Sequence, residues 1–240
     1  MTFGIDLVIG SGADSLLSPR QELFLPEKLM TALEYSRIIP LVGEEIPLVV
    51  SSEIIIQSVN PEIHRLKFWD SPLIIGIILL ITYLTLAIVG YRKKRIFRIP
   101  FALLFLIAGL AGCIVTSLSF FSDHPCTQYN WNLLWLHPIH FLGIIAFFFS
   151  LPNTASPDKK SKIFSKERIK FAMTGLFCWF HQSNLVLLSL LLLAIHRIPQ
   201  QLNKATIPYI LCLWIASGYW LLLLKLRRDK SRLYIKKKHE

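Results

Sequence analysis

Charged residues are missing from five long apolar segments of this 240-residue sequence. The segments contain no Lys, Arg, Asp or Glu, and they run Pro72–Tyr91, Ile99–Phe121, Leu133–Leu151, Phe171–Ile195 and Ile207–Leu224. Each holds 18 to 25 residues, and a helix of about 20 apolar residues crosses a hydrocarbon core of about 30 Å. One such segment could be the buried helix of a soluble domain, whereas five within 153 residues predict a polytopic membrane domain.

Further absences argue against other classes of protein. The five segments have no carboxylate for ion coupling, and no inverted repeat or matched pair of broken helices is visible, which disfavours a transporter. The basic residues are not interleaved with aromatic residues, so nucleic acid is not an expected partner. Only four cysteines are present, and three of them lie within the apolar segments, so no disulfide framework is visible.

Basic residues are abundant but unevenly placed. Five lie in Arg92–Arg98, six in Pro152–Lys170 and eight in Lys225–Glu240, which together account for 19 of the 26. The alternate loops are poor in them, because 122–132 has none and 196–205 has two. Loops rich in Lys and Arg stay in the cytoplasm. We therefore expect the amino terminus outside and the carboxyl terminus in the cytoplasm.

The segment before the first span is acidic, with five basic and ten acidic residues in 1–70. Ser18-Pro19-Arg20-Gln21 matches a capping box with proline at the first helical position, and a second helix should begin near Pro26. The Val- and Ile-rich run Ile46–Ile56 predicts one or two strands. These elements lack partners for their apolar faces, and Met1–Gly10 is no secretory signal. We therefore expect the chain to begin inside a larger domain.

The predicted fold class is mainly α. A polytopic five-helix transmembrane bundle over residues 71–226 follows a partial periplasmic α/β segment over residues 1–70. A basic cytoplasmic tail occupies residues 227–240.

The loop Ser122–Asn132 holds the densest group of polar residues. Asn130 and Asn132 could cap the helix of the third span, because their side chains can accept from free backbone N–H groups. With His124 and Trp131 beside them, the same two amides could instead hold a lipid headgroup or a substrate. The sequence leaves both interpretations open.

Histidines in and near the third span raise the question of a metal. His137 and His140 are three residues apart and would share a helix face, either as a metal pair or as a hydrogen-bonded structural pair. Two histidines do not make a zinc or haem site, although His124 and His196 are expected on the same side. Asp123-His124-x-Cys126 would suit a thiolate nucleophile, but sequence neighbours rarely point at one another. We predict no metal and no cofactor.

Polar residues also lie within the fourth span. His181 and Asn184 can share a helix face while Gln182 points elsewhere, because successive residues rotate by about 100°. The pair could bond neighbouring helices together or line a substrate groove. The second span carries small residues suited to close helix packing, namely Ala108, Gly109, Ala111 and Gly112.

Several of these motifs resemble a known family. Phe3–Gly10, Ala13-Asp14 and Phe24-Leu25-Pro26-x-x-Leu29-Met30 resemble the end of the Lnb-type (DUF4105) periplasmic domain. The membrane half resembles the five-helix transmembrane domain that follows it in proteins of Bacteroidota. The carriers of that second resemblance are Gly109–Cys113, Ser122, His124-Pro125, Asn130–Trp135, and Pro199-Gln200 with Asn203.

The resemblance implies lipoprotein N-acylation, which transfers an acyl group from a phospholipid to the amino-terminal cysteine of a lipoprotein. The family's nucleophile would lie upstream of residue 1, and none of the four cysteines here matches it, so we assign no catalytic residue. His137 departs from the family, where asparagine is usual.

The implied role is that of a membrane platform in the bacterial inner membrane. Its implied partners are membrane lipids, a lipoprotein substrate, and a missing or separate periplasmic catalytic domain. We expect spans two to four, with the loop 122–132, to form a groove for acyl chains. The alternative is a non-enzymatic membrane anchor or interaction module that recruits a partner.

Overall fold

The computed structural model describes residues 2–14, 16–53, 71–93, 95–149 and 163–238. The chain forms two compact units, of which one comprises Met1–Asp14 and Leu66–Glu240 and the other Ser15–Arg65. The first 14 residues therefore group with the membrane half, whereas the sequence suggested a single segment over 1–70. Residues 54–70 and 150–151, which complete the predicted outer segment and third span, lie outside the described residues.

Five apolar stretches of the described chain are long enough to cross a membrane, and the mainly α prediction is confirmed. Four are continuous helices: α4 (Pro72–Lys93), α5 (Arg98–Phe121), α7 (Ile163–Ala194) and α8 (Thr206–Lys238). An apolar stretch in lipid becomes helical because every backbone N–H and C=O must be bonded within the protein. Helices α7 and α8 extend beyond the apolar stretches into charged sequence.

The third span is not the single helix predicted over Leu133–Leu151. Its α-helix, α6, covers only Phe141–Phe149. Three short 3-10 turns come before it, namely η3 (Pro125–Thr127), η4 (Trp131–Leu134) and η5 (Pro138–His140). Pro138 has no backbone N–H and disfavours helical backbone at His137, which is extended with a φ of −140°. The turns η4 and η5 pack against α5, and such burial is what non-helical backbone at membrane depth requires.

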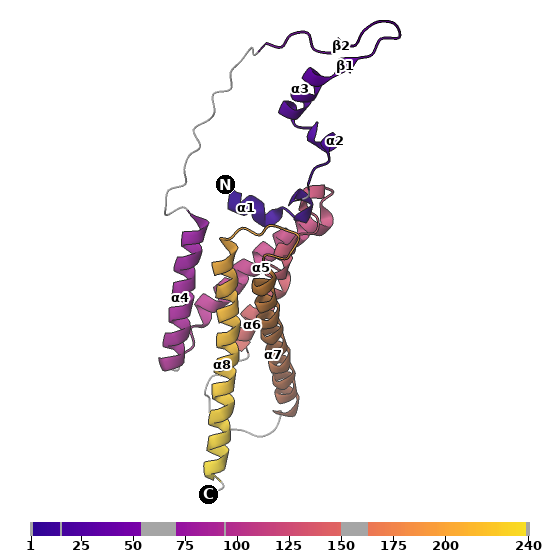
Figure 1. The fold of residues 1–240 in the computed structure, drawn as a ribbon. Coiled ribbons are helices and arrows are strands. Elements are labelled where there is room, and N and C mark those ends of the chain that lie inside the picture. Colours follow the sequence, from indigo (N-terminus) through magenta and orange to yellow (C-terminus); the bar gives the residue numbers. More distant parts are fainter. Residues whose placement is uncertain (1, 15, 54–70, 94, 150–162, 239–240) are drawn as a thin grey trace. The chain divides into compact units, whose positions relative to one another are not determined.

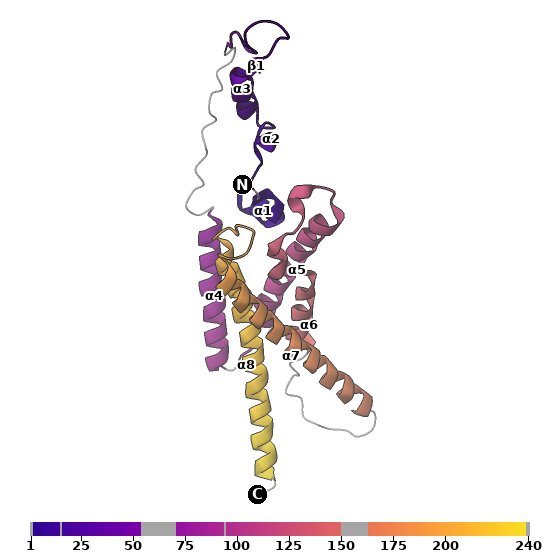
Figure 2. The same cartoon turned by 45° about the vertical axis from the view of Figure 1, so that its right-hand side comes forward.

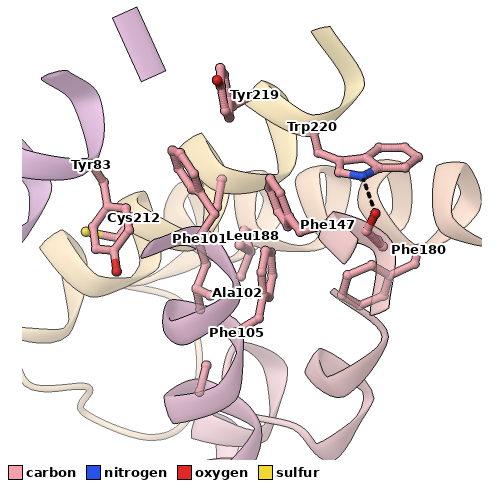
Figure 3. Close-up of a cluster of buried hydrophobic side chains, with 14 of the residues drawn as sticks. Tyr83, Phe101, Ala102, Phe105, Phe147, Phe180, Leu188, Cys212, Tyr219 and Trp220 are labelled. Atoms are coloured by element: carbon pink, nitrogen blue, oxygen red, sulfur yellow. Dashed lines mark hydrogen bonds between the residues drawn. The ribbon is translucent and has the colours of Figure 1, made fainter. Parts of the chain in front are cut away.

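Helix α8 packs against both α4 and α7, and α6 packs against α5 (Figures 1 and 2). Aromatic rings fill the space between these helices (Figure 3). Phe101 stacks on Phe147 and on Tyr219, with ring centroids 5.5 and 4.8 Å apart. Trp220 Nε1 donates to the carbonyl oxygen of Ala146 at 3.2 Å. This bond satisfies the one polar atom of a large buried ring.

Glycines let α5 approach the third span closely. A Cβ added at Gly112 would lie 2.5 Å from the carbonyl carbon of His137, and one at Gly109 would lie 3.1 Å from the Phe141 ring. The prediction that small residues of the second span form a packing face is therefore confirmed.

The unit Ser15–Arg65 is small. Its elements are α2 (Pro19–Glu22), α3 (Pro26–Tyr35) and the antiparallel strands β1 (Arg37–Ile38) and β2 (Ile46–Pro47). The capping box is confirmed, because Ser18 Oγ accepts from Gln21 N and Gln21 Oε1 accepts from Ser18 N. Of the run Ile46–Ile56, for which one or two strands were predicted, the described part contains one short strand, Ile46–Pro47. No described side chain of this unit is buried.

Candidate functional site

The two ends of the helical bundle differ in charge. The end that carries the loops 122–132 and 196–205 has only two basic residues in those loops, and we call it the charge-poor end. The opposite end carries the Arg92–Arg98 connection, and we call it the basic end. Two short elements, α1 (Thr2–Val8) and η1 (Ser11–Asp14), lie against the charge-poor end (Figure 1).

Main-chain hydrogen bonds join the start of η1 to the loop that precedes the third span. Gly10 N donates to the carbonyl oxygen of Cys126 at 2.7 Å, and Ser11 N donates to that of Tyr129 at 3.3 Å. The backbones are so close that a Cβ added at Gly10 would overlap the carbonyl oxygen of Gln128. Tyr129 has a φ of 53°, a left-handed conformation that is uncommon for residues other than glycine.

Four amide side chains of the charge-poor end bind the amino-terminal segment that contains α1 and η1. We call them the amide clamp: Asn130, Asn132, Gln200 and Asn203. Asn130 Nδ2 donates to the carbonyl oxygen of Leu7 at 2.8 Å. Asn132 Nδ2 lies 3.1 Å from the carbonyl oxygen of Asp6 and 3.2 Å from that of Leu7. Both carbonyls belong to the last turn of α1, where a helix supplies no donor for them. The two asparagines are buried, being only 5% and 1% exposed.

The other two clamp residues come from the loop before α8. Gln200 Nε2 donates to the carbonyl oxygen of Ile9 at 2.7 Å, and Asn203 Nδ2 donates to Asp6 Oδ2 at 2.6 Å. A hydrogen bond to a charged group contributes about 1.5–3 kcal/mol, more than a neutral pair. The clamp thus recognises both the backbone and one carboxylate of the segment.

Each clamp oxygen is already occupied by a donor from the membrane half. The pairs are Asn130 Oδ1 with Asn132 N, Asn132 Oδ1 with Trp135 Nε1, Gln200 Oε1 with Trp131 N, and Asn203 Oδ1 with Ala205 N. These bonds orient the amides, so that the amino groups face α1 and the residue after it. Asn130 is the N-cap of η4, as one of the two sequence interpretations predicted, although η4 is a 3-10 turn.

A pocket of about 430 Å³ lies beside the clamp, between the end of α5 and the loop that follows it. Its lining includes Ser119, Phe120, Tyr129, Asn130, Trp131 and Leu134. Phe120 and Tyr129 are strongly exposed, at 72% and 79%. Ser119 is 9% exposed, and its Oγ has no hydrogen-bond partner among the described residues. The pocket is therefore mainly apolar, and the unpaired Ser119 hydroxyl in its lining is buried.

His137 and His140 meet, but as a stacked pair. Their ring centroids are 3.9 Å apart with 17° between the planes, and His140 Nε2 lies 2.8 Å from the carbonyl oxygen of Trp135. His124 and His196 are exposed and do not join them. In the described ranges no group of three or more His, Cys, Asp or Glu side chains is arranged to hold a metal.

The polar pair of the fourth span meets a hydroxyl of α8. Asn184 Nδ2 donates to Ser217 Oγ at 2.8 Å, and His181 Nδ1 lies 3.3 Å from the same oxygen. His181 also stacks on Trp220 with centroids 4.5 Å apart. Both polar residues are buried and Gln182 is exposed, as the helical rotation predicted. The geometry agrees with bonding between helices rather than with an open groove.

Sequence reasoning about the residues alone missed the partners of the site. Gln200 and Asn203 entered only through the family resemblance, and neither Asp6 nor Ser217 was singled out. The sequence offered only a weak indication, namely three amide side chains (Gln200, Gln201 and Asn203) in a short loop with two charged residues. The clamp residues lie more than 120 positions along the chain from the residues that they bind. The sequence alone therefore does not indicate which polar groups meet.

A protein-family model described as the Lnb transmembrane domain matches the chain. It covers residues 64–158 and 162–228, which is more than half of the chain. Comparisons with curated proteins and with solved structures found no match.

Proposed function

The chain belongs to the Lnb transmembrane domain family, and we propose that it is the membrane platform of an Lnb-like lipoprotein N-acyltransferase. As a membrane-embedded module, it would hold an extramembrane catalytic domain at the bilayer surface, in the bacterial inner membrane. The charge-poor end would face the periplasm and the basic end the cytoplasm.

The observation that carries this proposal is the amide clamp with the pocket beside it. A chain segment bound by four oriented amides, at the end of a membrane bundle, is what attachment of an extramembrane domain requires. Residues 3–14 are also part of the stretch that resembles the end of the Lnb-type periplasmic domain. The clamp would therefore set the distance and orientation of the catalytic domain relative to the membrane.

The pocket would hold the lipid during the reaction. Phe120, Trp131 and Leu134 offer an apolar wall for acyl chains. Holding an acyl donor beside a nucleophile raises the rate through proximity and orientation. The nucleophile would come from the catalytic domain, so no residue of this chain is assigned to the chemistry.

The proposal is tested by measuring the amino termini of lipoproteins. A strain that lacks the gene would be complemented with the wild type or with variants, and peptide mass spectrometry would report the N-acylated fraction. We expect acylation to be lost on deletion, restored by the wild type, and reduced by Ser119→Phe, which fills the pocket. Ser117→Phe is the matched control, because Ser117 is exposed on the same helix and lines no part of the pocket.

A double variant, Asn130→Ala with Asn132→Ala, addresses the clamp in the same assay. We expect reduced acylation at unchanged protein abundance, measured by immunoblot. Unchanged acylation in the deletion strain would remove the acyltransferase role altogether. Normal acylation with the Ser119→Phe variant would remove only the role of the pocket.

A second candidate is a non-enzymatic anchor that recruits a partner protein. Apolar side chains of the unit Ser15–Arg65 favour it, since Leu16, Phe24 and Val42 are each more than 90% exposed. A photo-crosslinker at Phe24 would then capture a separate periplasmic protein, whereas one at Glu27 would not. A partner captured in a strain with unchanged lipoprotein acylation would favour the anchor over the platform.

A further inference from the structure

A second pocket lies between α4 and α8 toward the basic end, and nothing in the proposed function uses it. Its volume is about 310 Å³, and its lining includes Ala87, Tyr91, Arg92, Trp214 and Gly218. The two helices lie side by side in both views (Figures 1 and 2). We call this pocket the α4–α8 groove.

The groove is held open by contacts on either side of it along the helices. Toward the charge-poor end, Tyr209 OH donates to the carbonyl oxygen of Pro72 at 2.8 Å. At the basic end, Tyr219 OH donates to the carbonyl oxygen of Arg95 at 2.9 Å, and Gly90 lacks the side chain that would overlap this hydroxyl. The small residues Ala87 and Gly218 lie between these two contacts. The side chains of α4 and α8 therefore do not fill the space between the helices.

The mouth of the groove combines a charge with an amphipathic ring. Arg92 lies in the last turn of α4, and it is exposed. Arg92 forms no ion pair with an acidic residue in the part of the chain that the structure describes. Tyr91, next to Arg92 in sequence, is 46% exposed, and such a ring favours the headgroup level of a bilayer. Trp214 lies deeper in the groove, where its Nε1 donates to Ser189 Oγ at 3.0 Å.

We propose that the α4–α8 groove binds one anionic phospholipid from the leaflet at the basic end. An acyl chain would lie along the apolar lining, and the lipid phosphate would accept hydrogen bonds from the Arg92 guanidinium, whose planar fork suits phosphate. Charge complementarity selects an anionic lipid, because the connection Arg92–Arg98 holds five basic and no acidic residues. Basic pockets between transmembrane helices bind anionic headgroups in this way.

The bound lipid would also support the fold. It would cover apolar surface that α4 and α8 leave open, and it would neutralise part of the charge at the basic end. This site is separate from the pocket at the charge-poor end, so the inference does not depend on the acyltransferase proposal.

Native mass spectrometry tests the site on the full chain in nanodiscs that contain equal amounts of phosphatidylglycerol and phosphatidylcholine. We expect retained phosphatidylglycerol to exceed phosphatidylcholine, and Arg92→Gln to lower that preference about five-fold, as expected for one charge near the surface. Lys93→Gln is the matched control, because Lys93 is its exposed neighbour and does not line the groove. Ala87→Phe should expel the lipid by filling the groove, whereas Ile81→Phe, on the exposed surface of α4, should not.

Equal retention of the two lipids by the wild type would overturn the proposal. An equal effect of Arg92→Gln and Lys93→Gln would overturn it as well, because it would indicate a diffuse charge effect. A protein that releases lipid and forms dimers through α4 and α8 would show that a second copy occupies the groove instead. Melting temperatures in detergent would identify any variant that has not folded, and Arg92→Gln, at an exposed position, remains the decisive one.

Discussion

At the scale of single residues, two small residues determine how the helices of this bundle pack against each other. Gly112 allows α5 to contact the main chain of the third span, because a Cβ there would lie 2.5–2.6 Å from the His137 backbone. Ser217 brings together two buried polar groups of α7 through one hydroxyl. In a membrane, where water satisfies no buried group, such single contacts control helix position.

Gly112→Ala should destabilise the protein by about 1–3 kcal/mol, because the new methyl group must displace backbone rather than a flexible side chain. Gly175→Ala is the matched control, since nothing lies within 4 Å of a Cβ at that position and alanine is the better helix former. Thermal unfolding of purified protein in detergent measures both. Equal melting temperatures for the two variants would contradict the close approach of α5 to the third span.

Ser217→Ala should cost about 1–2 kcal/mol, because it leaves polar atoms of His181 and Asn184 without their partner in the core. Ser183→Ala makes the same chemical change at a serine that precedes Asn184 in sequence but takes no part in that contact. Its hydroxyl forms no hydrogen bond among the described residues, so we expect a change near zero. Denaturation in a detergent series measures the difference, and a smaller loss for Ser217 than for Ser183 would refute the assignment.

At the scale of elements, the start of the third span and helix α1 stabilise each other. The turns η4 and η5 interrupt the helix where a membrane normally demands one. Asn130 and Asn132 stabilise η4 with their oxygens and bind α1 with their amino groups. Interrupting the helix thus provides the polar surface to which the amino-terminal segment binds.

Gly10→Ala should release this segment, because a Cβ at Gly10 would overlap the carbonyl oxygen of Gln128. Gly4→Ala should not, since a Cβ at Gly4 has no neighbour within 4 Å. Hydrogen exchange followed by mass spectrometry would measure the amides of residues 5–12. We expect exchange to accelerate about ten-fold in the first variant, which corresponds to about 1.4 kcal/mol. Identical exchange in both variants would mean that the close backbone contact at Gly10 does not hold the segment.

At the scale of the whole molecule, the asymmetric distribution of basic residues predicts a single orientation. Cys126 lies at the charge-poor end and is exposed, whereas Cys212 is buried and the other two cysteines lie within spans. A membrane-impermeant maleimide should therefore label Cys126 in intact spheroplasts, and Cys126→Ser should abolish the signal. Labelling that requires permeabilised cells would place this loop in the cytoplasm and reverse the orientation.

Much of the architecture follows from local sequence. The five spans, the mainly α class and the capping box at Ser18 were all predictable, because hydropathy and capping depend on residues within one or two turns of each other. The uninterrupted third helix was a wrong prediction. Its apolar composition indicated a helix, but Pro138 and the hydrogen bonds of Asn130 and Asn132 favour short turns.

The sequence by itself determined how often the chain crosses the membrane and where its basic charge lies, since both depend on composition summed along the chain. Only the tertiary structure decided which groups the amides bind, where the third helix begins, and which small residues leave a groove between α4 and α8. The clamp bonds join residues 123 to 197 positions apart. Such pairings depend on the folded backbone, because a polar side chain specifies what it can bind but not which group will reach it.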